Sequence, residues 1–399
     1  MKMKQMRYID KYVGTVLCAL LTVSYKLFAK ISGNNKNNNI PDQVNRILMV
    51  KFWGMGSIML ASCAVRAVRE RYPKAKIYFL TFAKNREVCE SLGMIDQIVA
   101  LDPSSFWRFA FNAIKTLHYL RSLKLDLAMD LEFLARFSAI MTYLSGARKT
   151  AEFHSNILWR GDFSKIKVSY NCYYHLTENF LNLVRLLGIQ ERTKDLVRPQ
   201  VEQKVREKIG GILKENRIGT GEMLLGVNIN SNVMALERRW PKQNFAALLN
   251  RLLDEYSIKV VLIGGKEDRN YVDGFANSLI HKEKVANLAG KISIKELIAL
   301  LEHCALFISN DSGPLHIACA LDIPTVSFFG PETPTLYGPQ GQKHLVHFNS
   351  LLCSPCMNIH NNKLVTCLMN NKCMTDISVD QVHASIKEKY GDILENRKS

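Results

Sequence analysis

The sequence predicts an α/β protein built from two doubly wound domains, each with a central sheet of parallel strands. From residue 46 onward, short segments rich in Val, Ile, Leu and Phe alternate with longer segments whose apolar residues recur at helical spacing. This alternation is typical of parallel sheets that are covered by helices on both faces. A length of 399 residues and a hydrophobic content of 47% are sufficient for two such cores.

The first domain is expected to span residues 46–195. Its predicted strands are 46–52, 76–81, 97–100, 125–130 and 149–153. Its predicted helices are 58–71, 85–92, 106–123, 135–144 and 172–187. A polar stretch at 188–200 is typical of a linker between domains.

The second domain is expected to span residues 196–376, followed by a C-terminal helix within 377–399. Its predicted strands are 224–228, 259–263, 285–287, 306–309 and 325–329. Its predicted helices are 201–216, 244–256, 270–279, 294–303 and a short helix between the last two strands. The C-terminal helix is predicted from the helical spacing of Val379, Val382, Ile386 and Tyr390.

Residues 1–32 are predicted to form a hydrophobic helix that associates with a membrane, and the Asn-rich residues 33–45 a polar linker. The apolar run at 12–25 is shorter than the ~20 residues needed to cross a hydrocarbon core, and Lys26 and Lys30 flank it. We favour a helix that lies on the inner membrane surface, where basic flanks suit anionic headgroups. A packed cap on the first domain and a spanning helix are the alternatives.

The formal net charge of +17 favours acidic partners, such as nucleic acid, an anionic membrane surface or a phosphorylated substrate. Lys and Arg are dispersed without a run of five, and the sequence contains no zinc-finger or RNA-recognition signature. We therefore expect no nucleic-acid partner.

Residues 308–330 predict an anion-binding helix start between two buried strands. Asp311 or Ser312 can serve as the N-cap, Gly313 permits a tight turn, and Pro314 suits the first helical position. The free backbone N–H groups and the positive end of the helix dipole then face whatever lies above the strand ends. His316 is placed to point into the same crevice.

These residues carry a resemblance. The stretch Asn310-Asp311-Ser312-Gly313-Pro314-Leu315-His316-Ile317-Ala318 and the turn Phe329-Gly330-Pro331 resemble glycosyltransferase family 9, the ADP-heptose:lipopolysaccharide heptosyltransferases. Family-like segments also begin at Glu237, Gly264 and Leu288. The resemblance implies the GT-B architecture, in which two Rossmann-like domains face each other across a cleft and the last helix packs back on the first domain.

The resemblance also implies the donor site. An inverting transfer from a nucleoside-diphosphate sugar must neutralise the leaving diphosphate, and no Asp-x-Asp metal motif is present, so cations and helix N-termini are expected to do so. Arg238 is the candidate cation, the backbone at Ser312 and Gly313 the candidate anion hole, and Ser231 a candidate hydroxyl donor. By resemblance, the remaining donor contacts are Glu267 to the ribose, the backbone near Ile292 to the adenine, and Asp311 and His316 to the sugar or diphosphate.

The acceptor half departs from the family. In the family, the turn after the first strand commonly ends Gly-Asp, and this Asp is regarded as the base; here the turn ends Gly56-Ser57. A serine is no base at neutral pH. Asp130 is therefore the candidate replacement base, with Glu132 beside it, although Asp130 can equally cap the following helix. Gly56 and Ser57 remain candidate acceptor contacts.

Two further basic residues and four cysteines complete the candidate sites. Lys51 and Arg136 are candidates for attracting an anionic acceptor such as a lipid A core. Six of the ten cysteines lie in apolar segments, as in proteins of a reducing cytoplasm. The other four form a C-x2-C-x10-C-x5-C pattern compatible with a structural zinc site or with structural thiols: Cys353, Cys356, Cys367 and Cys373.

The sequence thus predicts an inverting glycosyltransferase that needs no metal cofactor and acts at the cytoplasmic face of the bacterial inner membrane. Its expected partners are a nucleotide-sugar donor, most simply ADP-heptose, and an anionic glycolipid acceptor of the lipopolysaccharide type. The alternative, motivated by Ser57, is a glycosyltransferase-like binding or scaffold protein of envelope glycan synthesis. A Rossmann oxidoreductase is disfavoured, because no Gly-x-Gly-x-x-Gly follows a strand.

Overall fold

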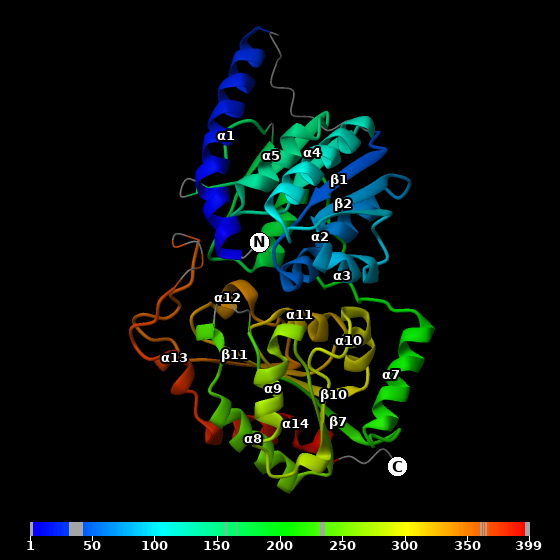
Figure 1. The fold of residues 1–399 in the computed structure, drawn as a ribbon, viewed down its shortest axis with the longest axis vertical. Coiled ribbons are helices and arrows are strands. Elements are labelled where there is room, and N and C mark those ends of the chain that lie inside the picture. Colours follow the sequence, from blue (N-terminus) through cyan, green and yellow to red (C-terminus); the bar gives the residue numbers. More distant parts are fainter. Residues whose placement is uncertain are drawn as a thin grey trace. The chain divides into compact units, whose positions relative to one another are not determined.

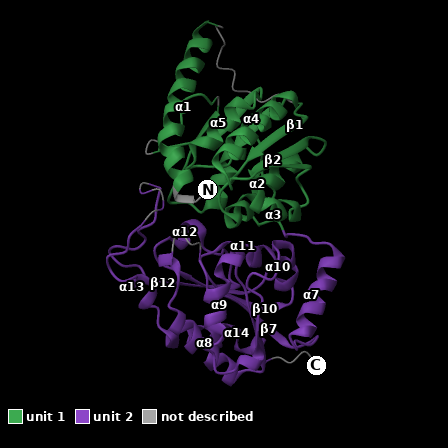
Figure 2. Ribbon diagram, in the orientation of Figure 1, with its two compact units in different colours: residues 1–197 green, residues 198–399 purple. Residues whose placement is uncertain are grey.

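The structure is a computed structural model that describes most of the chain: residues 3–31, 43–155, 158–164, 166–231, 236–359, 361, 363 and 365–395. Most of the predicted 33–45 linker lies outside these residues. The chain divides into two compact units, residues 1–197 and 198–399 (Figure 2). Each unit contains a six-stranded parallel sheet, which is the predicted α/β class.

Unit 1 has the strand order β3-β2-β1-β4-β5-β6 (Figure 1). Its strands are β1 Arg46–Val50, β2 Lys76–Phe82, β3 Gln97–Leu101, β4 Leu127–Asp130, β5 Lys149–His154 and β6 Ile166–Ser169. The sheet is wound outward from β1 in one direction to β3 and then in the other from β4, so the topological switch point lies between β1 and β4. The sequence did not predict β6, a four-residue strand at the sheet edge that carries Lys167.

The helices of unit 1 are α1 Met3–Ile31, α2 Met55–Arg71, α3 Arg86–Ser91, α4 Phe106–Ser122, α5 Arg136–Leu144 and α6 Leu176–Arg185, with the 3-10 turn η1 Ala83–Asn85 before α3. Right-handed crossovers put α4 and α5 on one face of the sheet and α2 and α3 on the other. On the α4–α5 face, Phe137 of α5 packs against Phe52 and against Phe109 of α4, with ring centroids 5.2 and 5.0 Å apart. Figure 1 shows α5 between α1 and α4.

Helix α1 is longer than the apolar run at 12–25 and packs against α5. Every fourth residue between positions 10 and 26 of this helix contacts another part of unit 1: Asp10, Gly14, Cys18, Thr22 and Lys26. The Asp10 carboxylate accepts hydrogen bonds from the backbone N–H groups of Arg136 and Phe137, at 3.0 and 2.7 Å. Asp10 therefore supplies α5 with acceptors for two N–H groups that the helix itself cannot satisfy.

The C-terminal half of α1 is held by the segment before β6. The Cys18 thiol donates to the carbonyl of Arg160 at 3.2 Å, and the Thr22 hydroxyl accepts from the N–H of Asp162 at 2.9 Å. The Lys26 ammonium lies 3.3 Å from the Asp162 carboxylate. One face of α1 therefore packs on the first domain, as the packed-cap alternative predicts.

Unit 2 has the strand order β12-β11-β10-β7-β8-β9. Its strands are β7 Met223–Asn228, β8 Ile258–Leu262, β9 Val285–Asn287, β10 Cys304–Asn310, β11 Thr325–Phe329 and β12 His344–Phe348. The switch point lies between β7 and β10, which pair in parallel with Ser309 opposite Asn228. The sequence did not predict β12, an edge strand with a histidine at its start and another in its interior.

The helices of unit 2 are α7 Gln203–Glu215, α8 Lys242–Glu255, α9 Arg269–Ala276, α10 Ile294–Leu301, α11 Gly313–Ala320, α12 Pro334–Tyr337, α13 Lys372–Thr375 and α14 Val379–Glu395. Three 3-10 turns accompany them: η2 Leu236–Arg238, η3 Lys266–Asp268 and η4 Lys282–Lys284.

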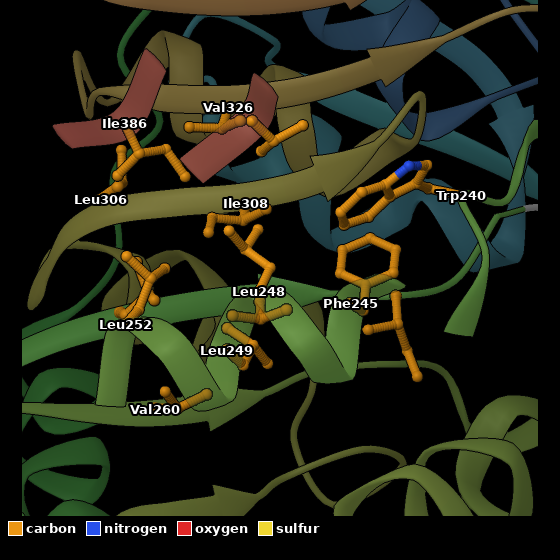
Figure 3. Close-up of a cluster of buried hydrophobic side chains, with 14 of the residues drawn as sticks. Trp240, Phe245, Leu248, Leu249, Leu252, Val260, Leu306, Ile308, Val326 and Ile386 are labelled. Carbon is orange, nitrogen blue, oxygen red and sulfur yellow. The ribbon is translucent and has the colours of Figure 1, made fainter. Parts of the chain in front are cut away.

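The core of unit 2 is built around Trp240, whose side chain is fully buried (Figure 3). Its ring stacks on Phe328 at 4.3 Å and meets Phe245 edge-on at 5.0 Å, while the indole N–H donates to the carbonyl of Ile377. Val382 and Ile386 of α14 belong to the same core. The apolar face of α14 is therefore buried in unit 2, whereas the resemblance implies packing of the last helix on the first domain.

We predict that Asp10→Ala lowers the free energy of unfolding by about 1–2 kcal/mol, because two N–H groups at the start of α5 lose their acceptor. Calorimetric or denaturant unfolding of the full chain measures the change. Asp102→Ala, at an exposed aspartate of unit 1 that bonds Ser104 on the surface, is the matched control and should stay within about 0.5 kcal/mol. Equal effects of the two variants would contradict a structural role for Asp10.

Candidate active site

The carboxyl edge of the unit 2 sheet gathers the residues predicted for the donor site. Loops leave this edge after β7, β8, β9 and β10, and they bond one another. The Asn230 side chain donates to the carbonyl of Ile263, and the Gly290 N–H donates to the carbonyl of Gly264 at 2.9 Å. Ligands of doubly wound sheets bind at this edge, beside the switch point.

A buried amide network fixes the loop after β10. The Asn310 side chain accepts a hydrogen bond from the backbone N–H of Trp240 at 2.8 Å and donates one to the carbonyl of Ile229 at 3.0 Å. Asn228 donates to the hydroxyls of Ser309 and Ser312, at 3.2 and 2.9 Å. Because these side chains link the loops after β7 and β10, the backbone that faces the switch point is held in one conformation.

Ser312 is the N-cap of α11, and no side chain caps this helix. The Ser312 hydroxyl bonds Ser309 and Asn228 instead of the backbone N–H groups of the first turn. Pro314 is the second residue of α11, one position later than predicted, and its missing N–H costs nothing there because the first-turn N–H groups have no intrahelical acceptor. The remaining N–H groups of that turn lack an intrahelical acceptor and can bind an anion.

Arg238 and Asp311 form an ion pair at this helix start, with Nη1 2.9 Å from Oδ2. Burial lowers the pKa of Arg238, but Asp311 and Glu332 more than offset this effect, so the pKa stays above its ordinary value and the guanidinium is charged. Its side chain keeps 19% of its surface exposed, against 5% for Asp311. The pair therefore presents a fixed cation to a ligand.

Glu332 and Lys363 are site residues that sequence reasoning missed. Glu332 follows β11, is 1% exposed, and pairs with the Lys363 ammonium at 2.7 Å. Burial raises the pKa of Glu332, and the charges of Lys363 and Arg238 oppose that rise. Its position directly after the Phe329-Gly330-Pro331 turn was the available signal, since this turn ends a strand at the same edge of the sheet.

The other predicted donor residues lie around the same edge. Ser231 is buried at the end of the described loop after β7, and His316 is buried in the first turn and a half of α11. Glu267 is exposed in η3, and its carboxylate lies about 3 Å from the position of a Cβ at Gly265. Ile292 is partly buried after β9. The structure thus distributes these residues over the loops after four neighbouring strands.

The carboxyl edge of unit 1 carries the predicted acceptor residues. Gly54, at φ +81°, turns the chain from β1 into α2, so that Gly56 and Ser57 occupy the first turn of the helix. The Ser57 hydroxyl oxygen is buried and has no hydrogen-bond partner among the residues that the structure describes. The first-turn N–H groups of α2 lack an intrahelical acceptor, and this hydroxyl keeps unused hydrogen-bonding capacity.

Glu132 holds the loop that leads into this turn. One carboxylate oxygen accepts hydrogen bonds from the N–H groups of Phe52 and Trp53, at 2.8 and 2.7 Å. The other oxygen pairs with the Lys51 ammonium at 2.9 Å, and both side chains are almost fully buried. Because Lys51 is 1% exposed and committed to Glu132, its placement disfavours the predicted role in attracting an acceptor.

Asp130 lies inside unit 1 with no exposed surface. Its carboxylate pairs with Arg160 and accepts from the Ser138 hydroxyl and the Glu132 N–H, each at 2.9 Å. A general base must reach the proton that it removes. The surroundings of Asp130 are those of a structural ion pair and disfavour the predicted role as base. Arg136 is likewise mostly buried against α1, with its guanidinium 4.0 Å from Asp10.

Glu152 adds a third carboxyl group to this cluster, on β5 opposite Asp130 in β4. Burial raises the pKa of Asp130 to about 6 and that of Glu152 to about 8, and the positive charge of Arg160 opposes both rises. At neutral pH, Asp130 is therefore ionised and Glu152 protonated. Lys167 lies directly opposite Glu152 on β6, and its positive charge also opposes the rise in the pKa of Glu152.

The structure does not support a zinc site in the C-terminal segment. All ten cysteines are free, and no group of three or more His, Cys, Asp or Glu side chains among the described residues is placed to hold a metal ion. Burial raises the pKa of the Cys373 thiol to about 11, and the neighbouring thiols of Cys356, Cys367 and Cys353 act in the same direction. Cys367 accepts a hydrogen bond from the Asn371 N–H, and Cys353 is exposed. The zinc interpretation is therefore withdrawn in favour of structural thiols.

The chain is similar to known glycosyltransferases over most of its length. The model of the family "Glycosyltransferase family 9 (heptosyltransferase)" matches residues 115–365. Lipopolysaccharide heptosyltransferase 2 of Salmonella typhimurium strain LT2 is 23% identical over 310 residues, which cover 75% of this chain and 86% of that protein.

Two solved structures show the same fold. The family 9 glycosyltransferase of Veillonella parvula superposes with a TM-score of 0.75 at 22% identity and covers 89% of this chain and 100% of that one. The ADP-heptose lipopolysaccharide heptosyltransferase II of E. coli superposes with a TM-score of 0.69 at 18% identity and covers 88% and 99%. The predicted fold class, two Rossmann-like domains of the GT-B type, is confirmed.

We predict that Glu152→Gln becomes more stable relative to the wild type as the pH rises. A carboxyl group whose pKa is higher in the folded than in the unfolded state stabilises the protein fully below its ordinary pKa of 4.5, and this contribution is lost as the pH rises through about 8. Glutamine cannot lose that proton. The difference in melting temperature should therefore increase by about 3 °C or more between pH 5 and pH 9.

Glu90→Gln, at an exposed glutamate of the same unit, is the matched control and should keep the pH profile of the wild type. A constant difference between Glu152→Gln and the wild type over this pH range would contradict the assignment of a protonated Glu152.

Proposed function

The chain belongs to glycosyltransferase family 9 and is a glycosyltransferase, and we propose that it transfers heptose from ADP-heptose to a lipopolysaccharide-type acceptor with inversion and without a metal ion. The names of its relatives support the sugar and the acceptor class. The observation that carries the proposal is the Arg238–Asp311 pair, which holds a charged guanidinium beside the uncapped N-terminus of α11.

The donor half acts on the leaving group. The acceptor oxygen attacks the anomeric carbon, the bond from that carbon to the diphosphate oxygen breaks, and the electron pair leaves with ADP. Arg238 and the N–H groups of Ser312 and Gly313 stabilise the negative charge that develops on the diphosphate. Asp311 positions Arg238 for this interaction, and Glu332 adds to the field that keeps the guanidinium charged.

We assign the nucleoside and the sugar of the donor to residues of the neighbouring loops. Glu267 is exposed beside the Gly264-Gly265 turn and is assigned to the ribose hydroxyls, which a carboxylate can accept from. The backbone near Ile292 is assigned to the adenine. Ser231 and His316, one on each side of the switch point, are assigned to the diphosphate and the sugar.

The acceptor half is built at the start of α2. Gly56 and Ser57 are assigned to orienting the acceptor hydroxyl, because the Ser57 oxygen is buried without a protein partner in the described chain. Three buried carboxyl groups of unit 1 are unavailable as bases: Asp130 pairs with Arg160, Glu132 bonds Lys51 and the backbone at 52–53, and burial raises the pKa of Glu152 to about 8. Ser57 orients the hydroxyl but does not remove its proton.

This arrangement also supports a second candidate function, a protein that binds the donor without turnover. Positioned general bases typically contribute about 10²–10⁴-fold to the rate, so a site without one binds its ligands far better than it reacts them. The donor half is complete in either case. Turnover separates the two functions, whereas donor binding does not.

We predict that Arg238→Ala lowers kcat/KM for ADP-heptose by about 10²–10³-fold, because the diphosphate loses its fixed cation. The wild type and the variant are incubated with ADP-heptose and heptose-deficient lipopolysaccharide, and ADP release and the glycolipid product are followed together. Arg251→Ala, at an exposed arginine of the same unit that pairs with Asp380, is the matched control and should retain wild-type kinetics.

Binding of ADP-heptose by the wild type without ADP release, over several acceptors, would favour the binding protein over the enzyme. Wild-type kinetics of Arg238→Ala would contradict the donor site itself.

We predict that Ser57→Asp raises kcat by about tenfold or more, because a carboxylate at this position can take the proton of the acceptor hydroxyl. An acidic residue in the first turn is also compatible with the dipole of α2. Ser57→Ala is the comparison and should lower kcat by about tenfold, because the acceptor hydroxyl loses the group that orients it. Wild-type kcat in both Ser57→Ala and Ser57→Asp would contradict this reading of the acceptor half.

A further inference from the structure

Two helices of unit 1 expose unusually large apolar side chains. Along α1 these are Tyr8, Tyr12, Val13, Val16, Leu17, Leu20, Val23, Leu27, Phe28 and Ile31, each at least 42% exposed. Along α4 they are Phe106, Trp107, Phe111 and Ile114, between 41% and 80% exposed. Exposed apolar surface of this extent marks a site of interaction.

The two exposed faces belong to one surface. Both helices pack against α5, and Figure 1 shows them on either side of it. Their N-terminal ends meet at a hollow lined by Gln5, Tyr8 and Ile9 of α1 and by Phe106 of α4. The residues Trp107, Phe111 and Ile114 follow the i, i+4, i+7 spacing of a single helix face.

The charges of both helices have one sign. The only carboxylate in α1 and α4 is Asp10, which is turned inward to the start of α5. Their exposed cations are Lys11, Lys26, Lys30, Arg108, Lys115 and Arg121. Aromatic side chains beside Lys and Arg are typical of segments that lie at the interface of an anionic bilayer.

We propose that α1 and α4 together form a membrane-docking surface, with both helices lying in the headgroup region of an anionic bilayer. Trp107 and Phe111 of α4 insert beside the exposed face of α1, and the surrounding Lys and Arg side chains contact the lipid phosphates. This surface would keep unit 1 at the membrane that holds a lipid-linked acceptor. The proposal stands on the surface itself and does not require turnover.

The contacts of α1 with unit 1 argue against a spanning helix. By length and composition, Gln5–Ile31 is a helix of the described chain that could cross a membrane. Yet α1 bonds unit 1 from Asp10 to Lys26, a stretch of about 24 Å at 1.5 Å per residue, most of the ~30 Å thickness of a hydrocarbon core. A spanning α1 would carry the polar groups of Arg136, Arg160 and Asp162 into that core, which is costly.

The charge pattern also argues against a second copy of the chain as the occupant. In a two-fold symmetric dimer the same surface faces itself. Two copies of this surface would bring their exposed Lys and Arg side chains together with no exposed carboxylate of α1 or α4 to pair with them. Anionic phospholipid satisfies the same cations, so the bilayer is the occupant that the charges favour.

Sedimentation of the full chain with vesicles tests this surface. We expect binding to vesicles of phosphatidylcholine with phosphatidylglycerol, weaker binding to phosphatidylcholine alone, and a loss of binding with rising salt. Trp107→Ser combined with Phe111→Ser should weaken binding at least about tenfold. Tyr173→Ser combined with Tyr174→Ser, which removes an exposed aromatic pair of unit 1 outside both helices, is the matched control and should bind like the wild type.

Three further measurements establish how deeply the protein inserts and whether the variants are folded. Brominated lipids should quench tryptophan fluorescence of the wild type but not of Trp107→Phe, and alkaline washing should release the protein from membranes. Unfolding curves establish that the double variants are folded. Three outcomes would each overturn the proposal: wild-type binding by the α4 double variant, retention of the protein after alkaline washing, or dimerisation without vesicle binding. None of them bears on the proposed transferase function, which is measured separately with a soluble acceptor.

Discussion

Loops that leave the carboxyl edge of a parallel sheet carry backbone groups that no neighbouring strand can pair. Each unit satisfies some of these groups with one buried side chain at or just after the end of a strand beside the switch point. In unit 2 the amide of Asn310 bonds the Trp240 N–H and the Ile229 carbonyl. In unit 1 the carboxylate of Glu132 bonds the N–H groups of Phe52 and Trp53. The conformation of each ligand-facing loop depends on this side chain.

The two side chains differ in charge, since Asn310 is neutral and Glu132 is a carboxylate. The two sheet edges therefore differ in how many of their cations are already paired. A neutral amide in unit 2 leaves Arg238 free to share its charge between Asp311 and a ligand. In unit 1 the Glu132 carboxylate is paired with the Lys51 ammonium, and Arg160 is paired with Asp130. The carboxylates of Asp130 and Glu132 are therefore each paired with a cation inside unit 1, and the Ser57 hydroxyl is a buried group of the described chain with unused hydrogen-bonding capacity. The donor edge carries available charge, whereas the acceptor edge offers only orientation.

Hydrophobic periodicity was sufficient to predict most strands and helices and the edge of each sheet where ligands bind, because buried parallel strands are apolar and continuous. It missed β6 and β12, which are edge strands with polar residues. It also missed the contacts that α1 makes at every fourth residue from Asp10 to Lys26, since Gly14, Cys18 and Thr22 interrupt the apolar pattern without any signal of a partner. The predicted roles of Asp130 and Lys51 are disfavoured because both are buried in ion pairs with residues far along the chain, Arg160 and Glu132. Sequence spacing carries no information on such pairings.

The same distinction bears on how this glycosyltransferase can work with serine at the position of the base. In glycosyl transfer, the bond to the leaving group and the bond to the acceptor need not progress equally. In the proposed reaction, if departure of ADP leads, most of the charge in the transition state lies on the diphosphate, which the proposal places beside Arg238 and the N-terminus of α11, and the acceptor hydroxyl loses its proton late. A hydroxyl that becomes strongly acidic on bonding to the anomeric carbon can lose its proton to water. Such a site needs an oriented acceptor more than a strong base, and the first turn of α2 with the Ser57 hydroxyl provides orientation.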